Sequence, residues 1–121
     1  MTEKENSKQY DLEERTLKFA KQVRAFVKKL KTTIANIEDG KQLIRASGSV
    51  GANYIEANEA LSKKDFLMRI KICRKEAKES RYWLRLIDTE GKDELEKQRM
   101  ALENEARELT HIFGSIVTKS K

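Results

Sequence analysis

Four stretches of this chain repeat apolar or small residues in alternating steps of three and four, and this spacing limits the folds open to the chain. Such a repeat places its members on one side of a helix. The chain contains no proline and only five glycines, so it lacks the turn residues that an all-β fold needs. The sequence therefore predicts an all-α protein in which four helices bury their seams against one another.

The four seams predict helices over about residues 12–31, 41–61, 62–88 and 93–118, with Ser62 as the N-cap of the third. The pair Asp39-Gly40 is interpreted as the break after the first helix, which Ile34 and Ile37 extend. Sustained three-four spacing and short links favour near-parallel packing of antiparallel neighbours. We therefore expect an antiparallel up-and-down four-helix bundle. The seam residues are Leu12, Thr16, Phe19, Val23, Phe26 and Leu30; Leu43, Ser47, Val50, Tyr54, Ala57 and Leu61; Phe66, Ile70, Cys73, Ala77, Ser80, Leu84 and Ile87, widened by Ile72, Trp83 and Leu86; and Leu95, Leu102, Ala106, Leu109, Phe113 and Ile116.

A length of 121 residues corresponds to one domain. We expect a flexible N-terminal tail over residues 1–10, a single bundle over 11–118 and a frayed C-terminus over 119–121. No apolar run approaches the roughly 20 residues that span a bilayer, and the charged N-terminus lacks the apolar core of a signal peptide. The sequence predicts a cytoplasmic protein without a membrane partner.

The second helix carries little charge and has a second stripe of apolar or small residues beside its seam: Ile44, Gly48, Gly51 and Ile55. Each glycine in a helix interior costs roughly 1 kcal/mol against alanine. Close approach of a neighbouring helix is the simplest feature that offsets this cost. A helix with so little solvated surface is expected to be buried on more than one side.

Polar residues also follow helical spacing along the edge of the seams. Arg45, Ser49, Asn53 and Glu56 lie on one stripe of the second helix, and Glu76 and Glu79 flank the third seam beside Trp83. We interpret them as a structural polar layer that fixes helix register, with Arg45 neutralising a carboxylate. A ligand or catalytic site and a subunit contact remain the alternatives.

The sequence assembles no set of residues for catalysis or metal binding. The pairs Glu56/Glu59 and Glu76/Glu79 lack the Glu-x-x-His partners of di-iron bundles, and His111 is the single histidine. Cys73 lies on a seam, where a cysteine behaves as a small buried hydrophobe. We therefore expect no enzyme activity, no metal and no cofactor.

The net charge of +6 is concentrated in two segments. Residues 11–31 hold seven lysines and arginines against three acidic residues, and residues 63–88 hold nine against four. Cations at this density can neutralise several phosphates, although a solvated helix face has the same composition. The candidate nucleic-acid-binding residues are Lys71, Arg74, Lys75, Lys78, Arg81 and Arg85 on the third helix, and Lys21, Arg24, Lys28 and Lys29 on the first.

The segment 42–57, which reads QLIRASGSVGANYIEA, the triplet Lys64-Asp65-Phe66 and the segment 75–84, which reads KEAKESRYWL, resemble the bacterial four helix bundle protein family. That family includes the proteins encoded in intervening sequences of 23S ribosomal RNA genes. Arg45, Ser49, Asn53, Glu56, Glu79 and Trp83 occupy the family's characteristic positions. The match is close over about residues 41–88 and holds by pattern in the flanking helices.

The resemblance implies a homo-oligomer, a five-fold ring, without enzymatic activity. A related branch, the accessory protein of diversity-generating retroelements, is a basic ring that binds nucleic acid and a reverse transcriptase. The expected partners are therefore further copies of this chain, RNA or DNA, or a protein such as a reverse transcriptase. We predict a helical-bundle protein that binds phosphate backbones, and the alternative is a structural adaptor with a protein partner.

Overall fold

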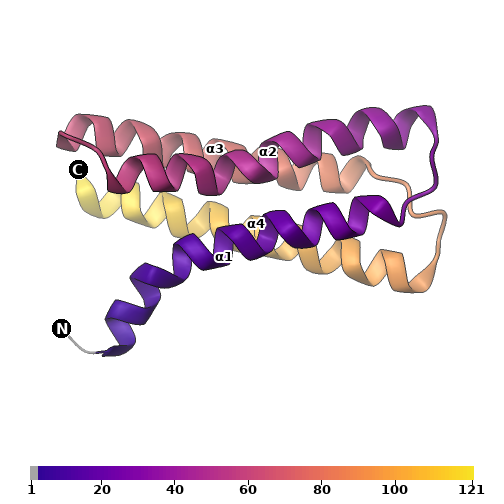
Figure 1. Cartoon of the computed structure of the whole chain (residues 1–121), viewed down its shortest axis with the longest axis horizontal. Helices are drawn as coiled ribbons and strands as arrows, with labels where there is room; N and C mark the ends of the chain where they lie inside the picture. Colours follow the sequence, from indigo (N-terminus) through magenta and orange to yellow (C-terminus); the bar gives the residue numbers. More distant parts are fainter. Residues whose placement is uncertain (1–2) are drawn as a thin grey trace.

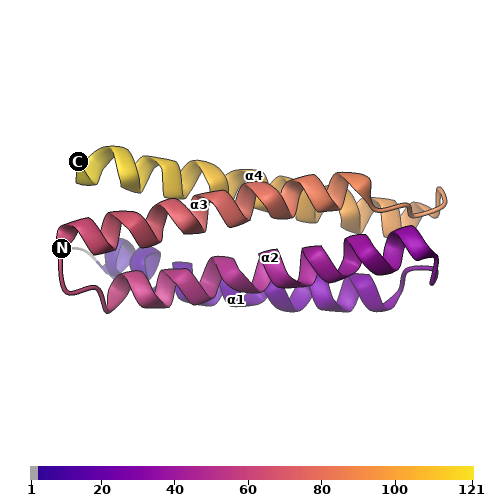
Figure 2. The ribbon, with the colours of Figure 1, turned by 90° about the horizontal axis from the view of Figure 1, so that it is seen from above.

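The computed structural model describes the backbone of residues 3–121 and the side chains of residues 12–121. It contains α1 (Glu3–Lys28), α2 (Ile34–Asn58), α3 (Lys63–Leu86) and α4 (Asp93–Ser120). Each helix contacts the next one along the chain, and α1 also contacts α4. The helices run alternately up and down, with the α1–α2 and α3–α4 loops at one end of the bundle (Figures 1 and 2). The predicted all-α, up-and-down bundle is confirmed.

The predicted seams form one continuous core. Phe19, Val23 and Phe26 of α1 and Phe113 of α4 are at most 1% exposed. Leu61 and Leu86 of the predicted core lie elsewhere: Leu61 is 99% exposed in the α2–α3 loop, and Leu86 is 47% exposed at the end of α3. Ile116 is partly buried and packs against the core, and Val117 beside it is buried. Leu61 continues the three-four spacing but lies beyond the end of α2 at Asn58, whereas Leu86 lies in the last turn of α3 between the buried Leu84 and Ile87.

The boundary between α1 and α2 differs from the prediction. Thr33 is the N-cap of α2, and its hydroxyl accepts a hydrogen bond from the Asn36 backbone N–H at 3.1 Å. The helix therefore begins at Ile34, and Asp39 and Gly40 lie within it. A Cβ on Gly40 would lie 3.3 Å from Val27 Cγ1. The glycine thus allows α1 to pack closely and does not form a turn.

Asn36 joins the two loops at this end of the bundle. Its side-chain Nδ2 donates to the Lys31 and Asp88 carbonyls at 3.1 and 3.0 Å, and its Oδ1 accepts from the Asp88 N–H at 3.1 Å. One 4%-exposed side chain therefore fixes the α1–α2 loop against the α3–α4 loop. At the opposite end, the predicted Ser62 cap is confirmed, since its hydroxyl accepts from the Asp65 N–H at 3.0 Å.

α1 begins at Glu3, which is earlier than the predicted start at Leu12. Residues 1 and 2 of the expected flexible tail lie outside the described part of the chain. The mobility of residues 1–10 and fraying at 119–121 stay predictions, although α4 continues to Ser120.

The glycine stripe of α2 lies against α1. A Cβ on Gly51 would lie 2.8 Å from Thr16 Oγ1, and one on Gly48 would lie 3.2 Å from Arg24 Nη2. The second stripe of α2 is therefore covered in part within the same chain. Ile55, at 51% exposure, and Ala52 remain open to solvent at its end.

Substituting Gly51 by alanine is expected to lower the free energy of unfolding by about 1 kcal/mol, although alanine is the better helix former. The added methyl group overlaps Thr16 on α1. Gly114→Ala is the matched control, because a Cβ there meets only Arg74 Cδ at 3.7 Å, and it should raise stability by up to about 1 kcal/mol. Urea denaturation measures both changes. Stabilisation by Gly51→Ala would contradict the close α1–α2 contact.

Candidate functional site

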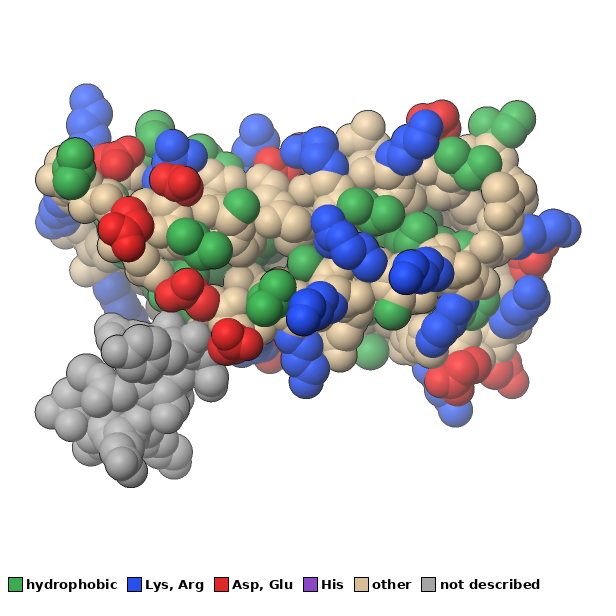
Figure 3. Space-filling view, in the orientation of Figure 1, with side chains coloured by type: hydrophobic (Ala, Val, Ile, Leu, Met, Phe, Trp, Pro, Cys, Tyr) green, Lys and Arg blue, Asp and Glu red, His purple; other side chains and the backbone are tan. Residues whose placement is uncertain are grey.

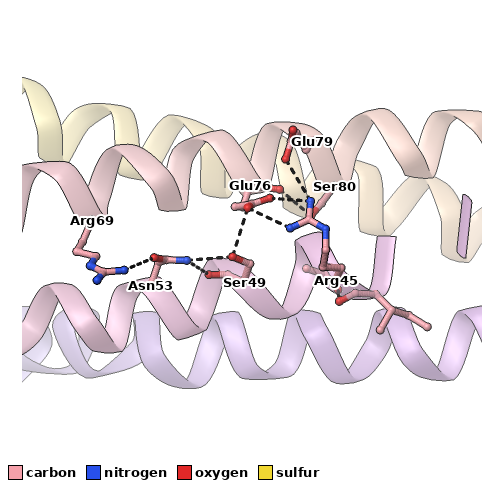
Figure 4. A network of polar contacts seen from close by, with 9 residues as sticks. Arg45, Ser49, Asn53, Arg69, Glu76, Glu79 and Ser80 are labelled. Atoms are coloured by element: carbon pink, nitrogen blue, oxygen red, sulfur yellow. Dashed lines mark hydrogen bonds and ion pairs between the residues drawn. The ribbon is translucent and has the colours of Figure 1, made fainter. Parts of the chain in front are cut away.

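A chain of polar contacts joins α2 to α3 (Figure 4). Arg45 of α2 places Nη1 3.4 Å from Glu76 Oε2 and Nη2 3.6 Å from Glu79 Oε2. Ser49 Oγ donates to the same Glu76 Oε2 at 3.4 Å. One arginine and one serine of α2 thus meet two carboxylates of α3.

The chain continues one turn further along α2. Asn53 Nδ2 donates to the backbone carbonyl and the Oγ of Ser49, both at 2.9 Å. On its other side, Asn53 Oδ1 accepts from Arg69 Nη1 of α3 at 3.1 Å. Sequence reasoning missed Arg69. Its signal was present, because Arg69 precedes Glu76 by two helical turns and therefore faces the same neighbour.

One carboxylate of this network is nearly buried, and its charge therefore needs a cationic partner. Glu76 is 7% exposed, whereas the Arg45 side chain is 55% exposed, so the cation reaches inward from solvent to a nearly buried anion. The pKa of the Glu79 carboxyl is raised, chiefly because it shares a hydrogen bond with Glu76 and is partly desolvated, while Lys75 and Arg45 oppose the shift. The groups pair with one another across α2 and α3, so the arrangement couples these two helices.

Two members of the predicted polar layer lie outside the network. Glu56 is exposed, and Trp83 packs at the edge of the core, where its ring meets Tyr82 at a centroid distance of 5.2 Å. Cys73 is fully buried, and desolvation raises the pKa of its thiol to about 12. Across the described residues, no three histidine, cysteine or acidic side chains lie close enough to hold a metal ion, and no helix is long and apolar enough to cross a membrane.

The candidate cations on α3 divide into two groups. The first faces outward and consists of Lys71, Lys75, Lys78 and Arg85, all of which are exposed. None of the four forms an ion pair with any acidic side chain in residues 12–121. We call these four residues the α3 basic row. The second group faces α4: Arg81 Nε lies 3.5 Å from Glu103 Oε2, and Arg74 passes beside Gly114.

On α1 the candidates are also in different situations. Lys21 and Lys28 are exposed. Arg24 and Lys29 are exposed as well, but each contacts another helix: Arg24 donates to the Ile44 carbonyl of α2 at 3.5 Å, and Lys29 donates to Gln98 of α4 at 3.4 Å.

Helices α1 and α3 are diagonal in the bundle, because α2 and α4 each contact both of them and the described backbones of α1 and α3 do not approach each other closely. The acidic residues of α4 pair with both neighbours. Arg15 of α1 contacts Glu105 and Glu108 at 2.7 and 3.3 Å, and Glu103 faces Arg81 of α3. A single chain therefore presents its α1 and α3 cations as two separate surfaces.

Comparisons with known proteins agree with this architecture. A solved structure titled as a protein of unknown function from the S23 ribosomal protein family of Bacteroides thetaiotaomicron VPI-5482 is similar to this chain, with 29% identity and a TM-score of 0.70. The match covers 88% of this chain and 97% of that one. No curated protein matches. The family model described as 23S rRNA-intervening sequence protein matches residues 8–115. With most of the chain matched and the bundle in place, the protein belongs to the family of 23S rRNA-intervening sequence proteins.

Proposed function

We propose that this protein is a non-enzymatic, cytoplasmic homo-oligomer that binds the phosphate backbone of RNA or DNA, with the α3 basic row as its primary contact. The observation that carries the proposal is the row itself, because its four cations are exposed and none of them forms an ion pair within residues 12–121. At 1.5 Å per residue, the row extends about 21 Å along α3. A row of this length can face several successive phosphates of one strand.

The α1–α2 face supports assembly. A shallow groove of about 330 Å³ runs between these helices. Its lining includes the apolar Leu17, Ala20, Ala52 and Ile55 and the two glycines, together with Glu13, Lys21 and Arg24. Leu17 and Ile55 are about half exposed. Lysines and arginines gather on this face toward the α1–α2 loop, and acidic residues gather toward the α2–α3 loop (Figure 3). A second copy that places its basic end over the acidic end of the first would be attracted to it. The resemblance to ring-forming proteins points to five copies.

Filter binding of RNA and DNA across a salt series tests the phosphate contact. Binding should weaken as salt rises, with a slope of log K against log salt of about −3 for the four cations of one row, and steeper in an assembly that engages several rows. Light scattering before and after nuclease treatment should report a homo-oligomer in both samples. Salt-independent affinity, or no binding at low salt, would contradict the phosphate contact.

A protein adaptor is the second candidate, and one observation favours it. A shallow depression of about 660 Å³ at the start of α3 has Leu67, Met68 and Ile72 among its lining, together with lysines. Such a surface suits an acidic partner segment with apolar side chains. Co-purification with one defined protein, unchanged by nuclease, would support the adaptor and not the nucleic-acid interface.

A further inference from the structure

An aromatic side chain lies exposed within the α3 basic row. Tyr82 is 56% exposed. It follows Lys78 by four residues and precedes Arg85 by three, and these spacings place both cations beside it on the helix surface. Lys78 and Arg85 are exposed and form no ion pair within the described residues. The ring is therefore bordered on both sides along the helix by positive charge.

The contact of Tyr82 with Trp83 leaves part of the ring free. The two rings meet at a centroid distance of 5.2 Å and an interplanar angle of 73°, which is an edge-to-face arrangement. Whichever ring presents its edge, this contact covers at most one face of Tyr82. Trp83 also packs against the core, so it limits the directions in which Tyr82 can turn.

From this juxtaposition, and resting on the proposed phosphate contact, we infer that Tyr82 is a stacking site for an unpaired nucleobase and that the protein prefers single-stranded nucleic acid to duplex. Cations hold a backbone on either side of the ring, and an aromatic face between them accepts any base, since every base has a π-face. A duplex keeps its bases stacked inside and offers this ring only its backbone. The preference therefore follows from the placement of a ring between cations.

Binding of the full chain to a 20-nucleotide single strand that contains 2-aminopurine, and to the same sequence as a duplex, tests the inference. Tyr82→Ala should weaken single-strand binding about tenfold or more and leave duplex binding within about twofold. It should also abolish the 2-aminopurine fluorescence change that stacking causes. Tyr82→Phe should retain both affinity and fluorescence change. Met100→Ala, which removes another exposed apolar side chain, is the matched control and should bind like the wild type.

The outcomes separate this inference from the proposed function. If the wild type binds neither the single strand nor the duplex at low salt, the proposed phosphate contact and the stacking site are both refuted. If it binds both and Tyr82→Ala weakens neither, or weakens both equally without a fluorescence change, the phosphate contact stands and the stacking site is refuted. Circular dichroism should show unchanged helix content in Tyr82→Ala, because the side chain lies outside the core cluster.

Discussion

Substitution of Phe113 by alanine is expected to lower the free energy of unfolding by about 4 kcal/mol. Phe113 is 0% exposed, and its ring meets Tyr54 of α2 at a centroid distance of 5.9 Å and an angle of 54°. The truncation removes an aromatic contact between α4 and α2 and leaves a cavity that the surrounding core can fill only in part. Denaturant unfolding followed by circular dichroism measures the change.

Met100→Ala on the same helix provides the control for this truncation. Met100 is 59% exposed, so its loss should change stability by no more than about 0.5 kcal/mol. A loss below about 1 kcal/mol for Phe113→Ala would show that the ring does not lie in the centre of the bundle.

Replacement of Lys71, Lys75 and Lys78 together by alanine is expected to weaken nucleic-acid binding about 100-fold at low salt. The same variant should make the slope of log K against log salt shallower by two to three, since each lost phosphate contact removes roughly 0.7 to 0.9. All three side chains are exposed, so the fold should persist. Filter binding at several salt concentrations gives both values.

A matched triple variant keeps the net charge change the same. Lys92, Lys97 and Lys119 are also exposed but lie on the α3–α4 loop and α4. Their joint replacement by alanine should leave the salt slope nearly unchanged. Equal loss of binding in the two variants would mean that total charge, and not the α3 basic row, determines the affinity.

Most of the fold follows from the spacing of apolar residues, because burial of a helix face requires it. The predicted boundary between the first two helices was wrong because glycine occurs both in turns and at close helix–helix contacts. Gly40 follows Asp39 as in a turn, but it lies within α2, where the absence of a side chain lets Val27 pack against it. The true signal was Thr33, whose hydroxyl caps α2.

The polar network was partly predictable. Arg45 and the acidic residues of α3 lie at helix edges that face each other once a bundle is assumed, and the structure places them in contact. The separation of the two basic surfaces was not predictable from segment charges. It depends on which helices are diagonal in the bundle, and on Glu103 and Glu105 of α4 reaching opposite neighbours.

The diagonal placement of α1 and α3 has a consequence for how this protein would organise its ligand. A strand lying on α3 reaches the exposed Lys21 and Lys28 of the same chain only by passing over α2, or over α4, whose carboxylates repel phosphates. A strand bound along α3 therefore leaves the exposed Lys21 and Lys28 of the same chain available to a neighbouring copy.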